Sequence, residues 1–211
     1  MLGIAASPRK GNTEILVREA LSAAKSIGDV DVEFISLHGK KINPCIDCRL
    51  CERNKSLCVQ KDDMQKIYPK IIEADGIIIG SPVYFHTISA QLKALMDRTT
   101  CLFKSEYDPS FPIKLDFTKK VGGAIAVGYS RHGGTEHAIQ TIINYFLSIH
   151  MVVVSGYTPY VYIGGAAWQV VDELDAVKRD EISIKAAREV GKRVAETAKL
   201  LKLGLEIINK K

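Results

Sequence analysis

The 211-residue sequence lacks several features that would assign it to a broad class of proteins at once. No apolar run reaches the length of a membrane span, and the chain passes from Met1 straight into a predicted strand, without a signal peptide. The net charge is +5, but the basic residues are spread along the chain and form no concentrated patch. We therefore expect a cytoplasmic protein that binds neither membranes nor nucleic acid.

Several catalytic patterns are missing as well. The sequence contains neither the G-x-G-x-x-G dinucleotide fingerprint nor the G-x-x-x-x-G-K-[ST] phosphate loop. It shows no Ser/His/Asp arrangement and no paired carboxylates, and its five histidines have no metal-ligand spacing. No hydrolytic arrangement therefore competes with the cofactor sites that the remaining sequence indicates.

Cysteine is scarce except in one stretch. Four of the five cysteines, Cys45, Cys48, Cys51 and Cys58, follow the spacing C-x2-C-x2-C-x6-C. In a reducing compartment such a group is more often metal-binding or catalytic than disulfide-bonded. The fifth, Cys101, lies on the apolar side of a predicted helix and is interpreted as a buried structural residue.

The cysteine spacing bears on which metal is bound. Structural zinc sites usually have two C-x2-C knuckles separated by a longer loop, whereas three cysteines in tandem resemble the run that wraps a ferredoxin cluster. Cys58 is assigned to the same cluster because the sequence has no second cluster motif. We favour a [4Fe–4S] cluster, with zinc as the main alternative and a disulfide or free thiols after it. Arg49, Arg53 and Lys55 either offset the charge of such a cluster or lie on a solvated loop.

Apolar strand-like runs alternate with helical patterns along the chain. The predicted strands are 2–6, 30–37, 76–80, 120–128 and 151–155. The predicted helices are 13–27, 62–74, 89–102, 135–149 and 181–203, with loops at 103–118 and 156–177. This order indicates an α/β fold, an open sheet of five parallel strands with helices on both faces. Residues 1–211 are interpreted as a single domain, with a cysteine-rich loop at 38–62 and a C-terminal segment at 156–211.

The loop after the first strand has the residues of a phosphate site. Ligands of an open parallel sheet bind beyond the carboxyl ends of its strands, and this loop runs into a helix N-terminus, which favours an anion. Ser7, Asn12 and Thr13 can donate hydrogen bonds there, and Arg9 adds positive charge. An ordinary capped turn would contain the same residue types, so this loop is ambiguous alone.

Two more loops reach the same edge of the predicted sheet. After the third strand, Tyr84 and Phe85 either stack on a flat ligand or pack as core aromatics. After the fourth strand, Gly133 and Gly134 allow close approach of the backbone, and Arg131 adds a charge. The three loops together describe a site for a phosphorylated planar cofactor.

With these motifs the sequence resembles the flavodoxin-like FMN-binding proteins. More closely, it is similar to the iron–sulfur flavoprotein family, within the NADPH-dependent FMN reductase-like group. The resemblance is carried by SPRKGNT after the first strand, GSPVYF after the third followed by Gln91-Leu92-Lys93 and Asp97-Arg98, SRHGGTE after the fourth and the four cysteines after the second. It covers residues 1 to about 155 and implies a flavodoxin-like doubly wound sheet.

The resemblance implies two cofactors and their ligands. The FMN phosphate is expected on Ser7, Arg9, Asn12 and Thr13. The flavin ring is expected against Pro82, Val83, Tyr84 and Phe85, and near Tyr129, Ser130, Gly133 and Gly134. A [4Fe–4S] cluster is expected on Cys45, Cys48, Cys51 and Cys58.

The resemblance also implies a function. It is that of an FMN-dependent oxidoreductase, which passes electrons from a ferredoxin-type donor through the cluster to FMN and on to oxygen, peroxide or a quinone. Members assemble as homodimers or homotetramers, with the cluster of one subunit near the flavin of another. Two alternatives stay open. One is an NAD(P)H-dependent FMN or quinone reductase whose cysteine loop is structural or binds zinc. The other is a non-catalytic redox-sensing module.

Overall fold

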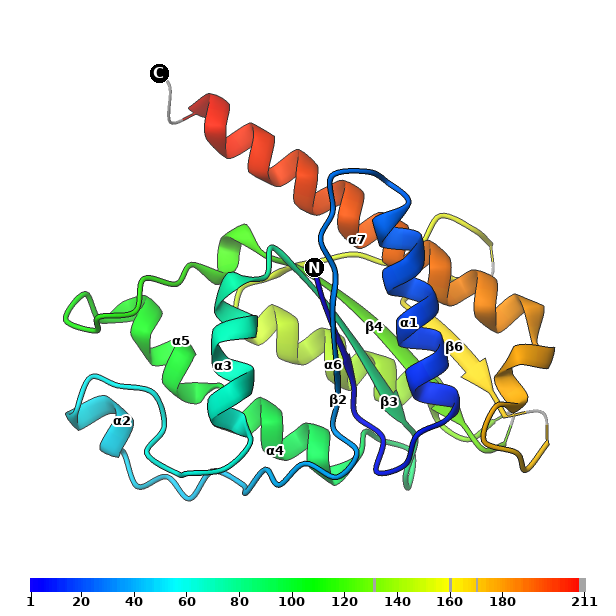
Figure 1. The fold of residues 1–211 in the computed structure, drawn as a ribbon, viewed down its shortest axis with the longest axis horizontal. Helices are drawn as coiled ribbons and strands as arrows, with labels where there is room; N and C mark the ends of the chain where they lie inside the picture. The colour runs from blue at the N-terminus through cyan, green and yellow to red at the C-terminus, as the bar shows by residue number, and fades with distance from the viewer. Residues whose placement is uncertain (131, 160, 170, 209–211) are drawn as a thin grey trace.

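The computed structural model describes residues 1–130, 132–159, 161–169 and 171–208 (Figure 1). Its centre is a parallel sheet in the strand order β2-β1-β3-β4-β5, with β6 also paired to β4. The open parallel sheet predicted from the alternating pattern is therefore present. Arg131, predicted to add charge in the loop after the fourth strand, lies outside the described residues.

The strands are β1 (Leu2–Ala5), β2 (Glu33–Ser36), β3 (Gly76–Pro82), β4 (Val121–Gly128), β5 (Val152–Val153) and β6 (Gly165–Trp168). The helices are α1 (Asn12–Lys25), α2 (Leu50–Arg53), α3 (Met64–Glu73), α4 (Ala90–Arg98), α5 (Thr100–Tyr107), α6 (Thr135–Ser148) and α7 (Glu181–Ile208). Two 3-10 turns are η1 (Phe117–Lys119) and η2 (Ala176–Arg179). Within the described parts of the chain, none of the helices has the length and apolar character needed to cross a membrane.

The core is divided into two halves by the sheet. Leu2 and Ile4 of β1 belong to the half that includes α3, α4 and α6, whereas Ala5 belongs to the half that includes α1 and α7. In β3, Ile78 faces the α1 side and its two isoleucine neighbours face the other. Successive side chains of a strand point to opposite faces, so a continuous apolar strand is buried on both. Figure 1 shows α1 beside α7, and these two helices are in contact.

The helix predicted at 89–102 is two helices instead of one. The chain turns at Thr99 between α4 and α5, and α5 continues to Tyr107, into the predicted loop. The hydroxyls of Thr99 and Thr100 donate to the carbonyls of Met96 and Asp97, at 2.6 and 2.7 Å. Such local side-chain bonds compete with regular helix bonding and explain an interruption that apolar spacing does not reveal.

The sequence predicts one fifth strand at 151–155, whereas in the structure two short strands, β5 and β6, both pair with β4. β5 has only two residues, which pair with Val121 and Gly122 of β4. β6 pairs with the other half of β4, from Ile125 to Gly128, and lies inside the segment predicted to be irregular. Glycine and alanine dominate β6 and have low strand propensity, so this strand gives no sequence signal.

Candidate functional site

A pocket of about 110 Å³ lies at the carboxyl ends of β1, β3 and β4 and is here called the strand-end pocket. Its lining residues are Ser7, Arg9, Asn12, Thr13, Pro82, Val83, Tyr84, Val127, Tyr129 and Gln169. Eight of the twelve residues predicted to bind FMN are among them. The sheet therefore brings the loops after β1, β3 and β4 together, and FMN binding by these residues stays a prediction.

The start of α1 lies at the strand-end pocket and has the features that favour an anion. Asn12 and Thr13 form the first turn of α1 and are buried, and no side chain caps this end of the helix. Gly11 is needed before the helix because a Cβ there would lie 2.6 Å from the carbonyl oxygen of Leu174. First-turn N–H groups and the positive end of the helix dipole suit a phosphate, with Arg9 beside them.

Gln169 lines the strand-end pocket and was not predicted. Its Oε1 accepts hydrogen bonds from Arg9 Nη2 at 3.4 Å and from Asn12 Nδ2 at 3.3 Å. Its Nε2 donates to Asp172 at 3.0 Å, and the residue is buried. Gln169 directly follows β6, so the signal that would have found it is the strand that the sequence did not reveal.

Four residues predicted to contact the flavin do not line the strand-end pocket: Phe85, Ser130, Gly133 and Gly134. Phe85 and His86 have left-handed backbone conformations, with φ of 47° and 64°, in a tight turn closed by paired hydrogen bonds between Tyr84 and Thr87. The Phe85 side chain is fully exposed. Gly134 packs this turn against α6, since a Cβ on it would lie 2.7 Å from His86 Cα. Contact of these four residues with a flavin stays a prediction.

All four tandem cysteines line a second cavity, beside α5, here called the cysteine cavity. Arg98, Lys104 and Cys101 line it as well. None of the five cysteines forms a disulfide bond. Burial raises the pKa of Cys51, with Lys104 opposing the shift, and burial also raises the pKa of Cys101. Cys101 is buried as predicted, but it lies against the tandem cysteines.

The donor set of the cysteine cavity fits an iron–sulfur cluster. The cavity is small, about 30 Å³, and within the described residues no three His, Cys, Asp or Glu side chains converge closely enough to hold one metal ion. One zinc ion needs its sulfurs about 2.3 Å from a single point, whereas a cluster with several iron corners needs thiolates spread around it. Ligand loops commonly take their final shape only with the metal. Four cysteines lining one cavity supply the donor atoms that a cluster requires.

One buried ion pair holds the two ends of the cysteine loop together. Arg98, the last residue of α4, donates from Nη1 to Asp62 Oδ2 at 2.6 Å and from Nη2 to Asp62 Oδ1 at 3.2 Å. Nη1 also donates to the carbonyl of Asn43 at 3.0 Å, and the N–H of Asn43 donates to Asp62 at 3.0 Å. The loop is therefore closed at residues 43 and 62 by contacts to α4.

Electrostatics keep this pair charged although both side chains are fully buried. Burial alone would raise the pKa of Asp62, but hydrogen bonds from Arg98 and from the N–H groups of Asn43 and Met64 lower it. Burial alone would lower the pKa of Arg98, but its hydrogen bonds to Asp62 raise it. A buried pair of this kind needs such additional hydrogen bonds to be stable.

The three cations predicted near the cluster all have partners in the structure. Arg49 is exposed and pairs with Asp47 at 3.6 Å, and Lys55 pairs with Asp108. Arg53 donates to the carbonyl of Cys48 at 2.8 Å. Arg98 belongs to a motif that carries the resemblance, but nothing in the sequence places it at the cysteine cavity, because its partner Asp62 is 36 residues away and a helical arginine usually faces solvent.

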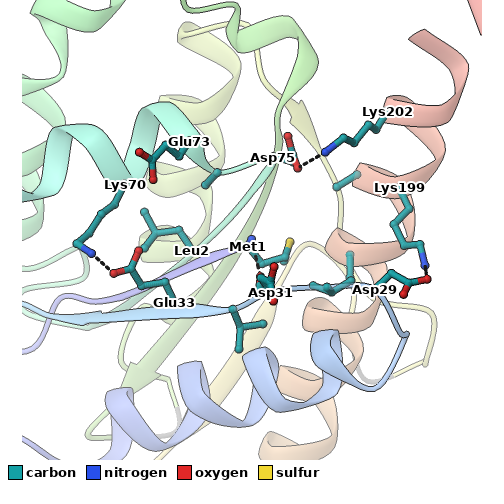
Figure 2. Close-up of a pocket in the computed structure, with 15 residues that line it drawn as sticks. Met1, Leu2, Asp29, Asp31, Glu33, Lys70, Glu73, Asp75, Lys199 and Lys202 are labelled. Carbon is teal, nitrogen blue, oxygen red and sulfur yellow. Dashed lines mark hydrogen bonds and ion pairs between the residues drawn. The ribbon is translucent and has the colours of Figure 1, made fainter. Parts of the chain in front are cut away.

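A larger hollow, of about 460 Å³, lies at the opposite end of the sheet, around the start of β1 and the residues before β3 (Figure 2). Three ion pairs cross its lining: Lys70–Glu33, Lys199–Asp29 and Lys202–Asp75. Parallel sheets bind ligands at the carboxyl ends of their strands, not at this end. We interpret this hollow as a charged surface depression.

Comparisons with known proteins agree with this geometry. A WrbA-like flavodoxin from Agrobacterium tumefaciens matches the structure with a TM-score of 0.63 at 18% identity, covering 94% of this chain and 96% of that one. This match confirms the predicted flavodoxin-like doubly wound fold. Residues 1–165 match the family model described as NADPH-dependent FMN reductase. The structure and the family model together define a flavodoxin-like oxidoreductase.

Relatives with higher sequence identity identify the family within this class of oxidoreductases. An iron–sulfur flavoprotein of Methanocaldococcus jannaschii is 47% identical over 205 residues, which cover 96% of this chain and 98% of that protein. An iron–sulfur flavoprotein of Archaeoglobus fulgidus is 40% identical over 196 residues, covering 93% and 95%. The chain belongs to the iron–sulfur flavoproteins of the NADPH-dependent FMN reductase family. The predicted family and the predicted class of activity, an FMN-dependent oxidoreductase, are confirmed.

Proposed function

We propose that the chain is an electron-transfer protein with FMN in the strand-end pocket and a [4Fe–4S] cluster on Cys45, Cys48, Cys51 and Cys58. The observation that carries this proposal is the presence of two separate sites in one chain, a phosphate-type pocket at the strand ends and four cysteines, none in a disulfide, around one cavity. Family membership supports both cofactors. When bound, the cluster supplies single-electron transfer and the flavin stores an electron pair.

The side chains of the strand-end pocket bind and orient the phosphate end of the cofactor. The hydroxyl of Ser7 accepts from the N–H of Arg9 at 3.2 Å, which leaves its own O–H free to donate. Arg9 supplies charge and Asn12 supplies an amide N–H, both now directed at Gln169. Pro82, Val83 and the half-exposed Tyr84 form the wall where the ring is expected.

The cysteine cavity offers a route for electrons from outside the protein. Cys45 is exposed, and the neighbouring Ile46 is 69% exposed, so one edge of the site faces solvent. We propose that a ferredoxin-type donor docks at this edge, in the cytoplasm, and that oxygen, peroxide or a quinone takes electrons at the flavin. Arg98, Asp62 and the loop ends hold the thiols in place for this transfer.

Helix α4 separates the two sites. Its N-cap, Ser89, donates to the carbonyl of Ala6 at 2.7 Å and accepts Leu92 N–H, and its last residue, Arg98, lines the cysteine cavity. Nine helical residues span about 14 Å. We propose a homodimer or homotetramer in which the cluster of one subunit approaches the FMN of another, because that arrangement shortens the path between cofactors.

Metal and flavin analysis of protein purified without oxygen tests this proposal. We expect four iron atoms and one FMN per chain. Zinc in place of iron, in protein never exposed to air, would contradict the cluster assignment and leave the flavin assignment intact.

A second candidate is an NADPH-dependent FMN or quinone reductase, which the description of the matching family model favours. The two candidates differ in the electron donor. Reduction of the flavin by NADPH alone, in the absence of air and of ferredoxin, would support the second candidate. Reduction by reduced ferredoxin, with no response to NADPH, would support electron transfer through the cysteine site.

A further inference from the structure

Arg98 has one hydrogen-bond donor that its known contacts do not use. A guanidinium group carries five N–H donors. Both Nη atoms bond to Asp62, and they also reach the carbonyls of Asn43 and, at 3.5 Å, Gln60. The Nε–H has no partner among the described residues, although Arg98 is only 1% exposed. A buried donor without an acceptor is costly, so an acceptor is expected beside it.

The position of Arg98 suggests what that acceptor is. Arg98 lines the cysteine cavity together with the four tandem cysteines. The other cations of this lining are more exposed and are paired with carboxylates, Arg49 with Asp47 and Lys104 with Glu52. Arg98 is therefore the cation of this lining that is fully removed from water and has a donor to spare.

We infer that the Nε–H of Arg98 donates a hydrogen bond to a sulfur atom of the cluster and its cysteine ligands, and that Arg98 thereby raises the reduction potential of the cluster. This inference rests on the proposed function, because it requires a cluster on the four cysteines. Hydrogen bonds and positive charge favour the reduced cluster, which is the more negative form. The bidentate pair with Asp62 fixes the guanidinium plane, so that Nε is held in place.

The direct test uses the unaltered sequence. Protein grown with ¹⁵N-labelled arginine and purified without oxygen is reduced by one electron at the cluster and measured by pulsed electron paramagnetic resonance. We expect a ¹⁵N hyperfine coupling to the cluster. The coupling should persist in Arg49→Lys, whose arginine lines the same cavity but is exposed, and should disappear in Arg98→Lys.

A second readout is the reduction potential, measured by titration of the cluster and the flavin in the same sample. In Arg98→Lys, which keeps the charge but loses Nε, the cluster potential should shift to a more negative value and the flavin potential should stay unchanged. Arg49→Lys should shift the cluster potential less.

The outcomes separate this inference from the proposed function. Four iron atoms per chain with no ¹⁵N coupling in the unaltered sequence would overturn the role of Arg98 and leave the proposed function standing. A chain without iron would overturn both. If Arg98→Lys does not fold, the coupling in the double variant Arg49→Lys/Arg53→Lys, which removes both arginines of the cysteine loop, still decides the question.

Discussion

The strand-end pocket and the cysteine cavity are built in different ways. The strand-end pocket is lined mainly by residues at or just beyond the ends of strands that hydrogen bonds hold in one sheet. The cysteine cavity is lined mainly by a loop whose one regular element is the four-residue helix α2, and side-chain bonds to Arg98 and Asp62 close that loop. The first site depends on the whole sheet and the second on a few side-chain contacts. They should therefore fail separately.

The largest expected effect tests this separation at a proposed cluster ligand. Cys51→Ser should abolish the cluster, because an iron–sulfur cluster is held by thiolates. Iron content and the visible absorbance of the cluster should be lost, while FMN stays at one per chain. Loss of FMN together with the cluster, in protein that is still folded, would show that the two sites are coupled.

Cys101→Ser is the matched control, since Cys101 lines the same cavity but is not a proposed ligand. Its Sγ lies 3.4 Å from the carbonyl of Arg98, a contact that a serine hydroxyl can also make. Iron content should stay close to that of the unaltered protein. If Cys101→Ser lost iron and Cys51→Ser kept it, the proposed ligand set would be wrong.

A smaller but substantial effect is expected from Asp62→Asn, which removes one charge of the buried pair. Removing one partner of such a pair commonly costs about 3–5 kcal/mol, because the other charge stays buried without compensation. The cluster absorbance should be lost at a lower temperature, and flavin release should shift less. The neighbouring Asp63, which accepts from the exposed N–H of Lys41, provides the control Asp63→Asn. Equal shifts for both cofactors would mean that the pair stabilises the whole fold, not the loop.

The same contrast explains what could be predicted from the sequence. Ser7, Asn12 and Tyr84 follow or end predicted strands, and parallel strands place such residues at one edge of a sheet. Chain order alone therefore brought most of the strand-end pocket together. Gln169 was missed because β6, the strand before it, consists mainly of small residues. For the same reason, the sequence did not reveal that two short strands, β5 and β6, pair with β4 where one strand was predicted.

In the cysteine cavity, the proposed cysteine ligands were predictable from the sequence, but the residues that hold their loop in place were not. The spacing of the four cysteines predicted a metal site, and the structure places all four around one cavity. The spacing says nothing of Arg98 or Asp62, which stand on α4 and just before α3 and meet only in the tertiary structure. Long-range pairs of this kind leave no periodic signal, so the local motif was predictable and its support was not.

A moderate effect is expected from Gln169→Glu in the strand-end pocket. The new carboxylate would lie beside Arg9 and Asn12, where the phosphate of FMN is expected, and like charges repel. The dissociation constant for FMN should rise at least about tenfold, equivalent to about 1.4 kcal/mol. The cluster content should not change. Riboflavin, which has no phosphate, is the control ligand, and its affinity should change much less. Equal losses for FMN and riboflavin would place Gln169 at the ring.

The smallest effect is expected from Phe85→Asn, which tests the edge of the strand-end pocket. Contact of Phe85 with the flavin stays a prediction; its side chain is fully exposed and its φ is 47°. Asparagine tolerates a left-handed backbone better than phenylalanine, so the stability of the turn should be kept or improved. An exposed substitution usually changes free energies by no more than about 0.5 kcal/mol, so FMN affinity should change about twofold at most. A tenfold loss of affinity, measured by flavin fluorescence, would show that Phe85 closes over the bound ring and that the pocket extends beyond the strand ends.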